Sequence, residues 1–308
     1  MILDLSTKSK PIIKWAGGKA GLLVQFQQHF PTGCRRYIEP FLGGGAVFLA
    51  LKDGTQSIIN DSNPELFNLY KIVRDKPDAL IEELDRLSGF YSEDFYYHLR
   101  ESRPRTLIKR AARTIFLNKT GFNGLYRQNS RGDFNVPFGK RPNCPQLCDR
   151  ANLLSVSERM KKSSLLNQDF EQVIDLAGEG DLVYCDPPYE PLNHTSSFNA
   201  YQGGGFSQAE QARLKDSCLR ASDRGALVFI SNSDTAYTRE LYADFKVYPI
   251  LAKRAINSRG DARGEISELL VQFGEPYLYK SAADMIIQKK LHTKLKRLKK
   301  KDLMACAS

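Results

Sequence analysis

The sequence has little that would hold a metal and no hydrophobic run long enough to span a membrane. Its 308 residues include four His and six Cys. Cys144 and Cys148 are the one close pair, and no second His or Cys pair lies nearby to complete a zinc site. The N-terminus lacks the basic and then apolar pattern of a signal peptide. We therefore expect a cytosolic protein with reduced cysteines, no metal and no membrane contact.

Acidic residues are scarce in two segments, and this imbalance predicts the kind of partner. The net charge is +10. Residues 100–142 hold eleven Lys and Arg against two acids, and the tail 275–308 holds nine against three, so that the remainder carries −5. A basic segment within a mildly acidic body predicts a polyanion lying along one face. For the tail we expect a solvated segment; non-specific DNA adhesion and an amphipathic partner helix are the alternatives.

Short apolar runs alternate with helical patterns along most of the chain. Apolar runs predict strands at residues 57–61, 165–170, 182–185, 226–230, 246–251 and 269–273. Apolar residues spaced three and four apart predict helices at residues 20–29, 64–73, 78–87, 105–118, 152–161 and 208–221. This alternation is typical of an α/β fold with a mostly parallel sheet and helices on both faces.

The strand predicted at 182–185 ends in a turn whose residues can hold an amine. Two prolines follow Asp186 and stop the strand at the sheet edge where ligands bind. Asp186 and the Pro187 carbonyl would each accept one N–H of an exocyclic amine on a flat ring, while Tyr189 stacks on the ring. An ordinary turn is the alternative, because Asp-Pro pairs are common in turns. The amine's lone pair can then face an electrophile, so Cys185 is not needed as a nucleophile.

Residues 37–61 have the pattern of a nucleoside site. A strand, a glycine turn and a helix are followed by a second strand that ends in Asp61, 18 residues after Gly43. Glycines let the backbone approach a ligand closely, and a carboxylate at this spacing suits ribose hydroxyls. The third glycine of dinucleotide-binding loops is absent. Trp15, beside another glycine turn, would either cover an aromatic or sulfonium-bearing ligand or pack in the core.

Residues 118–141 indicate a hairpin that reads a nucleic-acid groove. Asn-Gly and Arg-Gly-Asp mark turns, and residues 134–138 have an extended pattern. Arg can pair with guanine, apolar groups can touch the thymine methyl, and an aromatic ring can wedge into the base stack. The segment offers few residues that could form a core, so we expect a groove reader and not a purely structural hairpin.

Seven short stretches occur together in one order. They are KWAGGK at 14–19, EPFLGGG at 39–45, NDSN at 60–63, GFNGLYR at 121–127, FNVPFG at 134–139, DPPY at 186–189 and SNSD at 231–234. On these motifs the chain resembles the Dam-type DNA adenine-N6 methyltransferases, the α-class family that uses S-adenosylmethionine (SAM), over roughly residues 10–274. The resemblance implies a Rossmann-like SAM-binding catalytic domain at 10–63 and 151–274, a helical and hairpin target-recognition insert at 64–150, and a basic tail at 275–308.

The resemblance also implies roles for individual residues. Those that match the catalytic turn are Asp186, Pro187 and Tyr189. Those that match the cofactor site are Trp15, Ala16, Lys19, Phe41, Gly43, Asp61, Asp169, Phe170 and Asp186. Those that match the DNA-binding site are Lys14, Phe122, Asn123, Leu125, Arg127, Asn129, Pro137 and Lys140.

The DNA-binding positions resemble those of members that modify adenine in GATC. Arg127 falls on the guanine-reading arginine, and Lys14 on a lysine that contacts the other guanine. Leu125 and Pro137 fall on thymine-methyl contacts. Phe122 replaces a wedge residue that is usually Tyr and so keeps the ring without the hydroxyl. Asn123 matches a residue that engages the orphaned partner base.

The implied enzyme is a monomer that binds duplex DNA, flips the target adenine out of the stack and transfers a methyl group in line from SAM to N6. Two alternatives remain open. One is methylation of RNA or of a protein amide, since a related turn serves such amines, and the other is SAM and DNA binding without catalysis. The resemblance implies a place in the bacterial cytoplasm or nucleoid, or in the host cell if a mobile element encodes the protein. The sequence does not decide whether the enzyme has a cognate restriction endonuclease, works alone or belongs to a mobile element.

Overall fold

The computed structural model describes residues 1–129, 131–189, 206–253 and 265–276. The chain divides into two compact units, residues 1–275 and 276–308, and the first contains all the described helices and strands. No helix within the described ranges is long and apolar enough to cross a membrane. The glycine-rich stretch at 201–205 and almost all of the basic tail lie outside these ranges.

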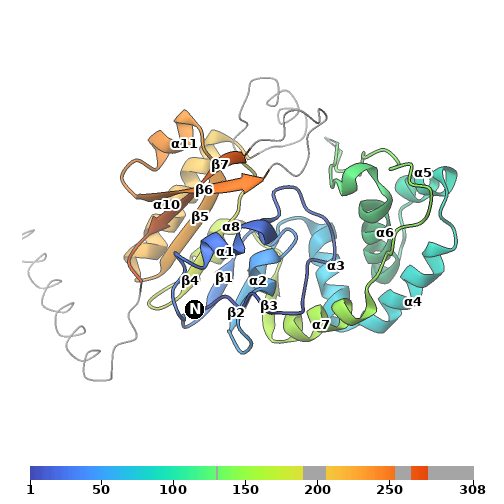
Figure 1. The fold of residues 1–308 in the computed structure, drawn as a ribbon, viewed down its shortest axis with the longest axis horizontal. Helices are drawn as coiled ribbons and strands as arrows, with labels where there is room; N and C mark the ends of the chain where they lie inside the picture. The colour runs from blue at the N-terminus through green and yellow to red at the C-terminus, as the bar shows by residue number, and fades with distance from the viewer. Residues whose placement is uncertain (130, 190–205, 254–264, 277–308) are drawn as a thin grey trace, which may run out of the picture. The chain divides into compact units, whose positions relative to one another are not determined.

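A seven-stranded sheet forms the centre of the first unit (Figure 1). In sheet order its strands are β3 (Ser163–Leu166), β2 (Ser57–Asn60), β1 (Tyr37–Glu39), β4 (Leu182–Cys185), β5 (Leu227–Ser233), β7 (Glu265–Phe273) and β6 (Lys246–Lys253). The first five are mutually parallel, whereas β7 pairs antiparallel with both β5 and β6. The prediction of a mixed α/β, mostly parallel, Rossmann-like sheet is confirmed.

The short apolar run of β4 explains why the sheet is covered on both faces. All four of its residues are buried. Leu182 and Tyr184 belong to one hydrophobic core, and Val183 and Cys185 to a second one. Because alternate side chains of a strand point to opposite faces, these two cores lie on the two faces of the sheet.

Helices cover both faces of the sheet and continue beyond one end of it (Figure 1). They are η1 (Lys19–Leu22), α1 (Leu23–Phe26), α2 (Ala46–Leu49), α3 (Pro64–Asp75), α4 (Pro77–Ser88), α5 (Glu93–Glu101), α6 (Leu107–Thr120), η2 (Phe122–Gly124), α7 (Arg150–Lys161), α8 (Phe170–Ile174), α10 (Gln208–Asp223) and α11 (Ala236–Leu241). The core that contains Val183 is closed by α8 and α10, and the other by α3, α6 and α7. The predicted helix at 20–29 is shorter than expected, since α1 ends at Phe26. The strand predicted at 165–170 is β3, and Phe170 opens α8 instead.

Of the helices between β2 and β3, α3 and α7 lie next to the sheet, and α4, α5 and α6 lie farther from it (Figure 1). Among these helices α6 packs against α3, α4 and α5. The described residues of the hairpin after α6 form isolated antiparallel bridges, Gly121 to Phe138 and Gln128 to Phe134. The division of the chain at residues 64 and 150 stays a prediction.

The hairpin contradicts one expectation from the sequence. Phe134, Val136 and Phe138 are all buried in the larger core, and Phe134 is only 7% exposed. The expectation that this segment has few residues able to form a core was wrong. Phe138 packs on Tyr91 and on Tyr96 of α5, and the Tyr96 hydroxyl donates to the Val136 carbonyl at 2.9 Å. The hairpin is therefore anchored along one side, and only its other side is available for a partner.

Candidate active site

Three acids meet at one edge of the sheet because three neighbouring parallel strands end there. Glu39 ends β1, Asp61 follows β2 and Asp186 follows β4. Glu39 is buried, it accepts a hydrogen bond from Tyr37 Oη at 2.8 Å, and burial raises its pKa well above the ordinary value. Asp61 and Asp186 are partly exposed. These two acids are the ones that a ligand at this edge can reach.

Lys19 forms an ion pair with Asp186. Its Nζ lies 2.8 Å from Asp186 Oδ1, and the side chains are 3% and 21% exposed. Burial raises the pKa of Asp186, and the nearby Lys19 ammonium opposes that rise. The carboxyl group thus already accepts an N–H donor at the place where the sequence analysis expects an exocyclic amine.

Tyr189 is fixed by an acid that lies outside the seven sequence motifs. Its hydroxyl donates a hydrogen bond of 2.7 Å to Glu268 Oε2 in β7. Lys19 Nζ lies 4.6 Å from the centre of the Tyr189 ring. Burial raises the pKa of Tyr189 well above its ordinary value, so the phenol is neutral. In the sequence, Glu268 could have been found as an acid that stands directly before the apolar run of the strand predicted at 269–273.

Two buried amides support the turn that carries Asp186. Gln211 Nε2, from α10, donates to the Pro188 carbonyl at 3.3 Å, and Asn232 Nδ2, from β5, donates to Gln211 Oε1 at 3.0 Å. Both side chains are fully buried. Asn232 lies in the SNSD stretch, so this hydrogen bond gives that motif a physical role in holding the turn. Gln211 was not identified from the sequence.

Cys185 is buried among apolar side chains directly before Asp186. Its Sγ lies 4.0 Å from Cys218 Sγ. Burial raises the pKa of the Cys185 thiol well above the ordinary value. A protonated and inaccessible thiol is a poor nucleophile.

The glycine loop between β1 and α2 makes room for Trp15. A Cβ added at Gly43, where φ is +50°, would lie 2.6 Å from Trp15 Nε1, and one at Gly44 would lie 3.1 Å from Trp15 Cβ. On its other side the Trp15 ring lies 5.0 Å from the Tyr126 ring of the hairpin. Trp15 is partly exposed. It therefore joins the glycine loop to the hairpin, and its contact with a cofactor stays a prediction.

Asp61 braces the same loop. Its two carboxylate oxygens accept hydrogen bonds from the backbone N–H groups of Gly43 at 2.8 Å and Asn63 at 2.9 Å. Burial raises the pKa of Asp61 to about 6. The carboxyl group is held at the end of β2, at the position where the sequence analysis expects ribose hydroxyls.

Aromatic rings line the edge next to this acid. Phe41 and Phe170 lie 5.4 Å apart, and Phe206 packs on both. Asp169, predicted to contact the adenine of the cofactor, caps α8 and pairs with Arg213 through two contacts of 2.9 Å. Its predicted contact with the adenine stays a prediction.

These groups fit a positively charged nucleoside such as SAM. A glycine loop, a carboxyl group suited to ribose and three aromatic faces lie at one sheet edge, and aromatic faces attract cations such as a sulfonium. Ala16 is exposed in the segment between Trp15 and Lys19. Among the residues that the structure describes, no cluster of three or more His, Cys, Asp or Glu could hold a metal ion.

Asn118 connects the N-terminal motif to the tip of the hairpin. Its side chain is fully buried. Its Oδ1 accepts from Lys14 N at 2.8 Å, and its Nδ2 donates to the carbonyls of Lys14 and Gly124 at 2.9 Å each. A Cβ at Gly124 would collide with the Lys14 side chain. Lys14 is thus brought next to the predicted DNA-binding turn, and the Lys14 side chain is exposed there.

The predicted wedge lies at the tip of that turn. Phe122 is 49% exposed, which is unusual for a Phe. Asn123 follows with φ of +54°, a left-handed conformation that Asn tolerates better than most residues. Leu125 is partly buried. An exposed ring on a rigid turn can enter a base stack.

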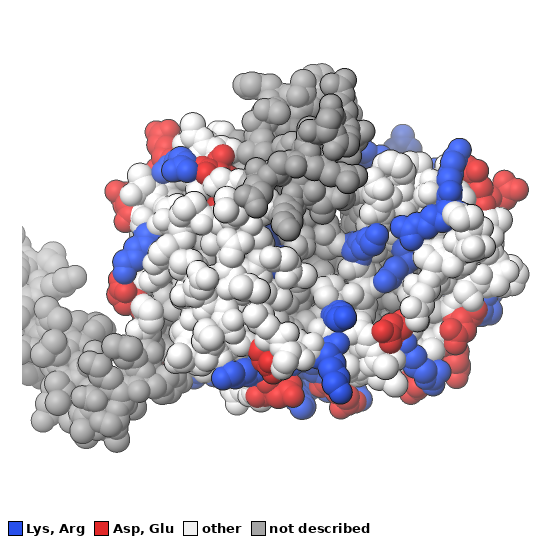
Figure 2. Space-filling model, in the orientation of Figure 1, with Lys and Arg blue, Asp and Glu red and all other residues white. Residues whose placement is uncertain are grey.

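The remaining predicted DNA contacts lie along the hairpin. Arg127 is exposed, and it donates through Nε to Asn135 Oδ1 at 2.8 Å and through Nη2 to the Asn135 carbonyl at 3.2 Å. Asn129 Oδ1 accepts from the backbone of Arg131 and Asp133, which closes the hairpin loop. The other two predicted contacts are exposed and are Pro137 and Lys140. Figure 2 shows exposed Lys and Arg side chains over the helical insert on the face in view.

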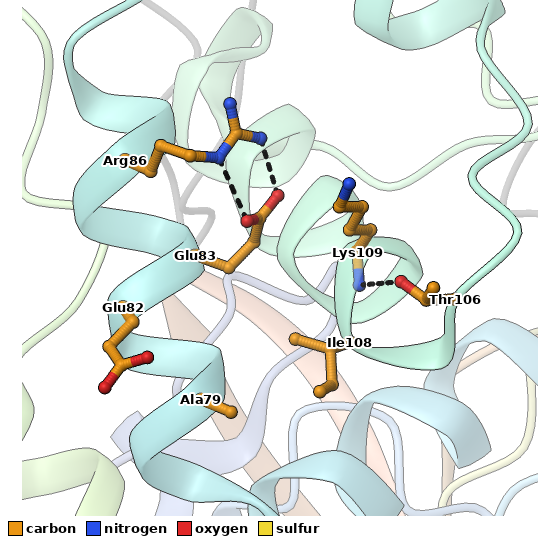
Figure 3. Close-up of a pocket in the computed structure, with 7 residues that line it drawn as sticks. All are labelled: Ala79, Glu82, Glu83, Arg86, Thr106, Ile108 and Lys109. Atoms are coloured by element: carbon orange, nitrogen blue, oxygen red, sulfur yellow. Dashed lines mark hydrogen bonds and ion pairs between the residues drawn. The ribbon is translucent and has the colours of Figure 1, made fainter.

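The groove shown in Figure 3 is separate from these residues. It lies between α4 and α6 and is lined by Ala79, Glu82, Glu83, Arg86, Thr106, Ile108 and Lys109. Arg86 and Glu83, both in α4, form an ion pair of 2.6 Å on one side of the groove. None of the predicted site residues lines it, so this groove does not belong to the sheet edge described above.

Comparisons with known proteins agree with this geometry. The family model described as D12 class N6 adenine-specific DNA methyltransferase matches residues 15–256. The chain is 39% identical over 270 residues to the type II methyltransferase M1.LlaDCHI of Lactococcus lactis subsp. cremoris, covering 85% of this chain and 94% of that protein. It is 40% identical over 284 residues to the type II methyltransferase M.MjaIII of Methanocaldococcus jannaschii, covering 85% and 98%. It is 36% identical over 274 residues to the DNA adenine methylase of Escherichia coli, covering 86% and 96%.

Proposed function

The chain belongs to the D12 class of N6 adenine-specific DNA methyltransferases, and from this premise we propose that it methylates adenine in duplex GATC sites by flipping the base. It is an adenine-specific DNA methyltransferase, and S-adenosylmethionine is the methyl donor. The GATC recognition sequence, the flipping of the base and the direct transfer of the methyl group to N6 are the parts that we propose. The observation that carries the direct transfer is the Asp186 carboxyl group, which already accepts the Lys19 ammonium at 2.8 Å. The exposed ring of Phe122 and the exposed Arg127 support the flipping and the reading of the site.

The catalytic turn acts on the adenine amine. Asp186 and the Pro187 carbonyl accept one N6 hydrogen each, and Tyr189 stacks on the purine. Bound SAM would supply a methyl carbon on a sulfonium sulfur; the N6 lone pair would form the new bond to that carbon, and the electron pair of the broken C–S bond would stay on sulfur. Burial raises the pKa of Asp186, which makes this carboxylate the better acceptor for the proton that N6 loses. No covalent enzyme intermediate forms, in keeping with the buried thiol of Cys185.

Bound SAM would lie along the sheet edge between the glycine loop and the catalytic turn. Asp61 would accept hydrogen bonds from the ribose, and the aromatic rings would flank the adenine of SAM. The residues that we propose to contact it are Trp15, Ala16, Lys19, Phe41, Gly43, Asp61, Asp169, Phe170 and Asp186.

The hairpin and the N-terminal motif read the DNA together. An N6 atom cannot be reached inside the stack, so the exposed ring of Phe122 replaces the flipped base while Asn123 engages its partner. Arg127 and Lys14 contact the two guanines, and apolar contacts select thymine. The residues that we propose to contact DNA are Lys14, Phe122, Asn123, Leu125, Arg127, Asn129, Pro137 and Lys140. We also propose that the enzyme acts as a monomer, because one chain supplies both the turn and the hairpin.

The experiment is methyl transfer from labelled SAM to duplex oligonucleotides that contain GATC, with GTTC and GATG duplexes as controls. Label at adenine N6 in the GATC duplex alone supports the reaction and the reader. Label in every adenine-containing duplex would support the catalytic role of the turn but contradict the proposal that Arg127 and Leu125 read the DNA sequence. A chain that binds SAM and labels no DNA contradicts the proposal.

A further inference from the structure

Glu268 comes from the end of the described chain, yet the sheet brings it to the catalytic turn. It lies in β7, which is inserted antiparallel between β5 and β6, and it is opposite Ser233 at the carboxyl end of β5. Because β5 runs parallel to β4, this position lies at the same sheet edge as Asp186. Its Oε2 accepts the 2.7 Å hydrogen bond from the Tyr189 hydroxyl, and the side chain is 15% exposed.

The same carboxylate lies close to Lys19. Lys19 Nζ is 2.8 Å from Asp186 Oδ1 and 4.0 Å from Glu268 Oε2. One buried ammonium therefore lies between two acids and above the ring of Tyr189. Charges interact more strongly here than in water, because little solvent screens them.

We propose that Glu268 is a positioning residue for methyl transfer, an inference that rests on the function proposed above. Its hydrogen bond fixes the plane of the Tyr189 ring, on which the flipped adenine stacks. When an N6 hydrogen of the adenine replaces Lys19 as the donor to Asp186, the negative charge of Glu268 attracts the Lys19 ammonium. Without that second acid, Lys19 would keep Asp186 as its partner and would compete with the adenine amine for it.

The charge count supports this role. Two carboxylates and one ammonium leave one negative charge around the turn. That charge stabilises the positive charge that N6 gains as it becomes methylated. Glu268 therefore acts on the reaction through its neighbours and through its field, without touching the reacting atoms.

The first test is Glu268→Gln, which keeps the shape of the side chain and an acceptor for Tyr189 but removes the charge. In single-turnover assays at saturating SAM and DNA, we expect the rate constant to fall roughly tenfold to hundredfold. SAM affinity, read from the fluorescence of Trp15, and DNA affinity should change by less than about twofold. A rate equal to that of the wild type would overturn the inference while leaving the proposed function intact.

Glu275→Gln is the matched control. It removes a carboxylate just past the end of β7, where Glu275 pairs with exposed Lys246 at 2.7 Å. The same change of charge on the same segment should leave the single-turnover rate unchanged. An equal loss in both variants would show that overall charge matters and would overturn the specific role of Glu268.

A second test separates the hydrogen bond from a general effect on folding. Tyr189→Phe keeps the ring and removes the hydroxyl, so Glu268→Ala should cost a smaller factor in that background than in the wild type. An equal loss of rate in the two backgrounds would overturn the proposal that Glu268 acts through its hydrogen bond to Tyr189.

A spectroscopic measurement without substrates completes the test. The Cζ resonance of Tyr189 in a ¹³C-labelled protein, identified by its loss in Tyr189→Phe, should shift in Glu268→Ala, which removes the acceptor, and an unmoved resonance would overturn the contact. A wild-type chain that methylates no DNA would overturn the proposed function and the inference together.

Discussion

The ammonium of Lys19 lies 2.8 Å from the carboxyl group of Asp186 and is almost completely buried there. This acceptor is therefore engaged by a donor from the chain itself. An isolated buried carboxylate would be costly, and the ion pair offsets much of that cost. In the mechanism proposed above, the target adenine replaces the Lys19 donor with its own N–H group, which would give the arrangement of these two residues a part in the catalytic cycle.

Replacement of Asp186 by Ala should remove the acceptor for N6 while leaving the DNA-binding hairpin in place. We expect turnover to fall by roughly 10²- to 10³-fold, as for the loss of other groups that act mainly in the transition state. Affinity for a GATC duplex, measured by fluorescence anisotropy, should persist. Retained methyl transfer at normal rates would contradict the assignment of the catalytic turn.

Replacement of the preceding residue, Cys185, by Ala is the matched control for this experiment. The thiol is fully buried and burial raises its pKa, so we expect no role in the chemistry. The variant should lose stability by about 1 kcal/mol from the small cavity, while turnover at saturating SAM stays close to that of the wild type. A large loss of turnover at unchanged SAM affinity would point to covalent catalysis.

Asp61 should give a measurable dependence of stability on pH. Burial raises its pKa from 3.8 to about 6, so between these values the folded state binds more protons than the unfolded state. The stability that this group contributes is thus present at low pH and is lost as the pH rises through about 6. Relative to the wild type, Asp61→Asn should gain about 2 kcal/mol of unfolding free energy between about pH 4 and pH 7. Denaturant titrations across this range would measure it, and a constant difference would contradict the raised pKa.

The titration of Asp61 should also change the affinity for SAM, but this affinity should rise with pH where the stability falls. Ribose hydroxyls donate to the charged form of Asp61, so SAM binding by the wild type should weaken as the pH falls below about 6. Asp61→Asn should bind SAM more weakly than the wild type at neutral pH and show no such pH dependence. Fluorescence of Trp15, the single Trp of the chain, offers the readout.

Arg127 should contribute to discrimination between DNA sequences more than to overall binding. Asn135 holds two of its donors, and a guanidinium has others that can reach a guanine. Arg127→Ala should cost about 1–3 kcal/mol in kcat/KM on GATC and relax the preference at one outer base pair. Competition between GATC and duplexes changed at each outer pair would measure this. A uniform loss on all sequences would indicate a phosphate contact instead.

Asn118 should couple the stability of the fold to DNA binding. Its buried side chain makes three hydrogen bonds, to Lys14 and Gly124, and its loss would leave buried backbone groups unpaired. We expect Asn118→Ala to cost about 2–4 kcal/mol of unfolding free energy and to weaken binding of a GATC duplex.

Asn152 provides the control for Asn118. It makes the same reciprocal pair of hydrogen bonds to the backbone of Lys10, at 2.7 and 3.0 Å, but in an exposed place. Asn152→Ala should therefore cost about 1 kcal/mol or less and leave DNA affinity unchanged. Equal effects of the two variants would show that Asn118 has no special link to the hairpin.

The sequence alone determined the elements whose signals are local. The strand at 182–185 is predicted with its observed bounds, because an apolar run followed by two prolines has few other conformations. Asp61 and Asp186 are placed at one edge because acids that follow parallel strands meet there. The motif order also indicated the family, which the comparisons confirmed.

Only the tertiary structure decided which distant groups meet. Glu268 reaches Tyr189 because β7 turns back antiparallel beside β5, and no pattern along the chain encodes that pairing. The burial of Phe134, Val136 and Phe138 was missed for the same reason, since the surface that covers them comes from helices elsewhere. Local sequence sets backbone conformation through sterics and periodicity, whereas the partners of a buried side chain depend on how separate elements pack, and that is fixed only when the whole core forms.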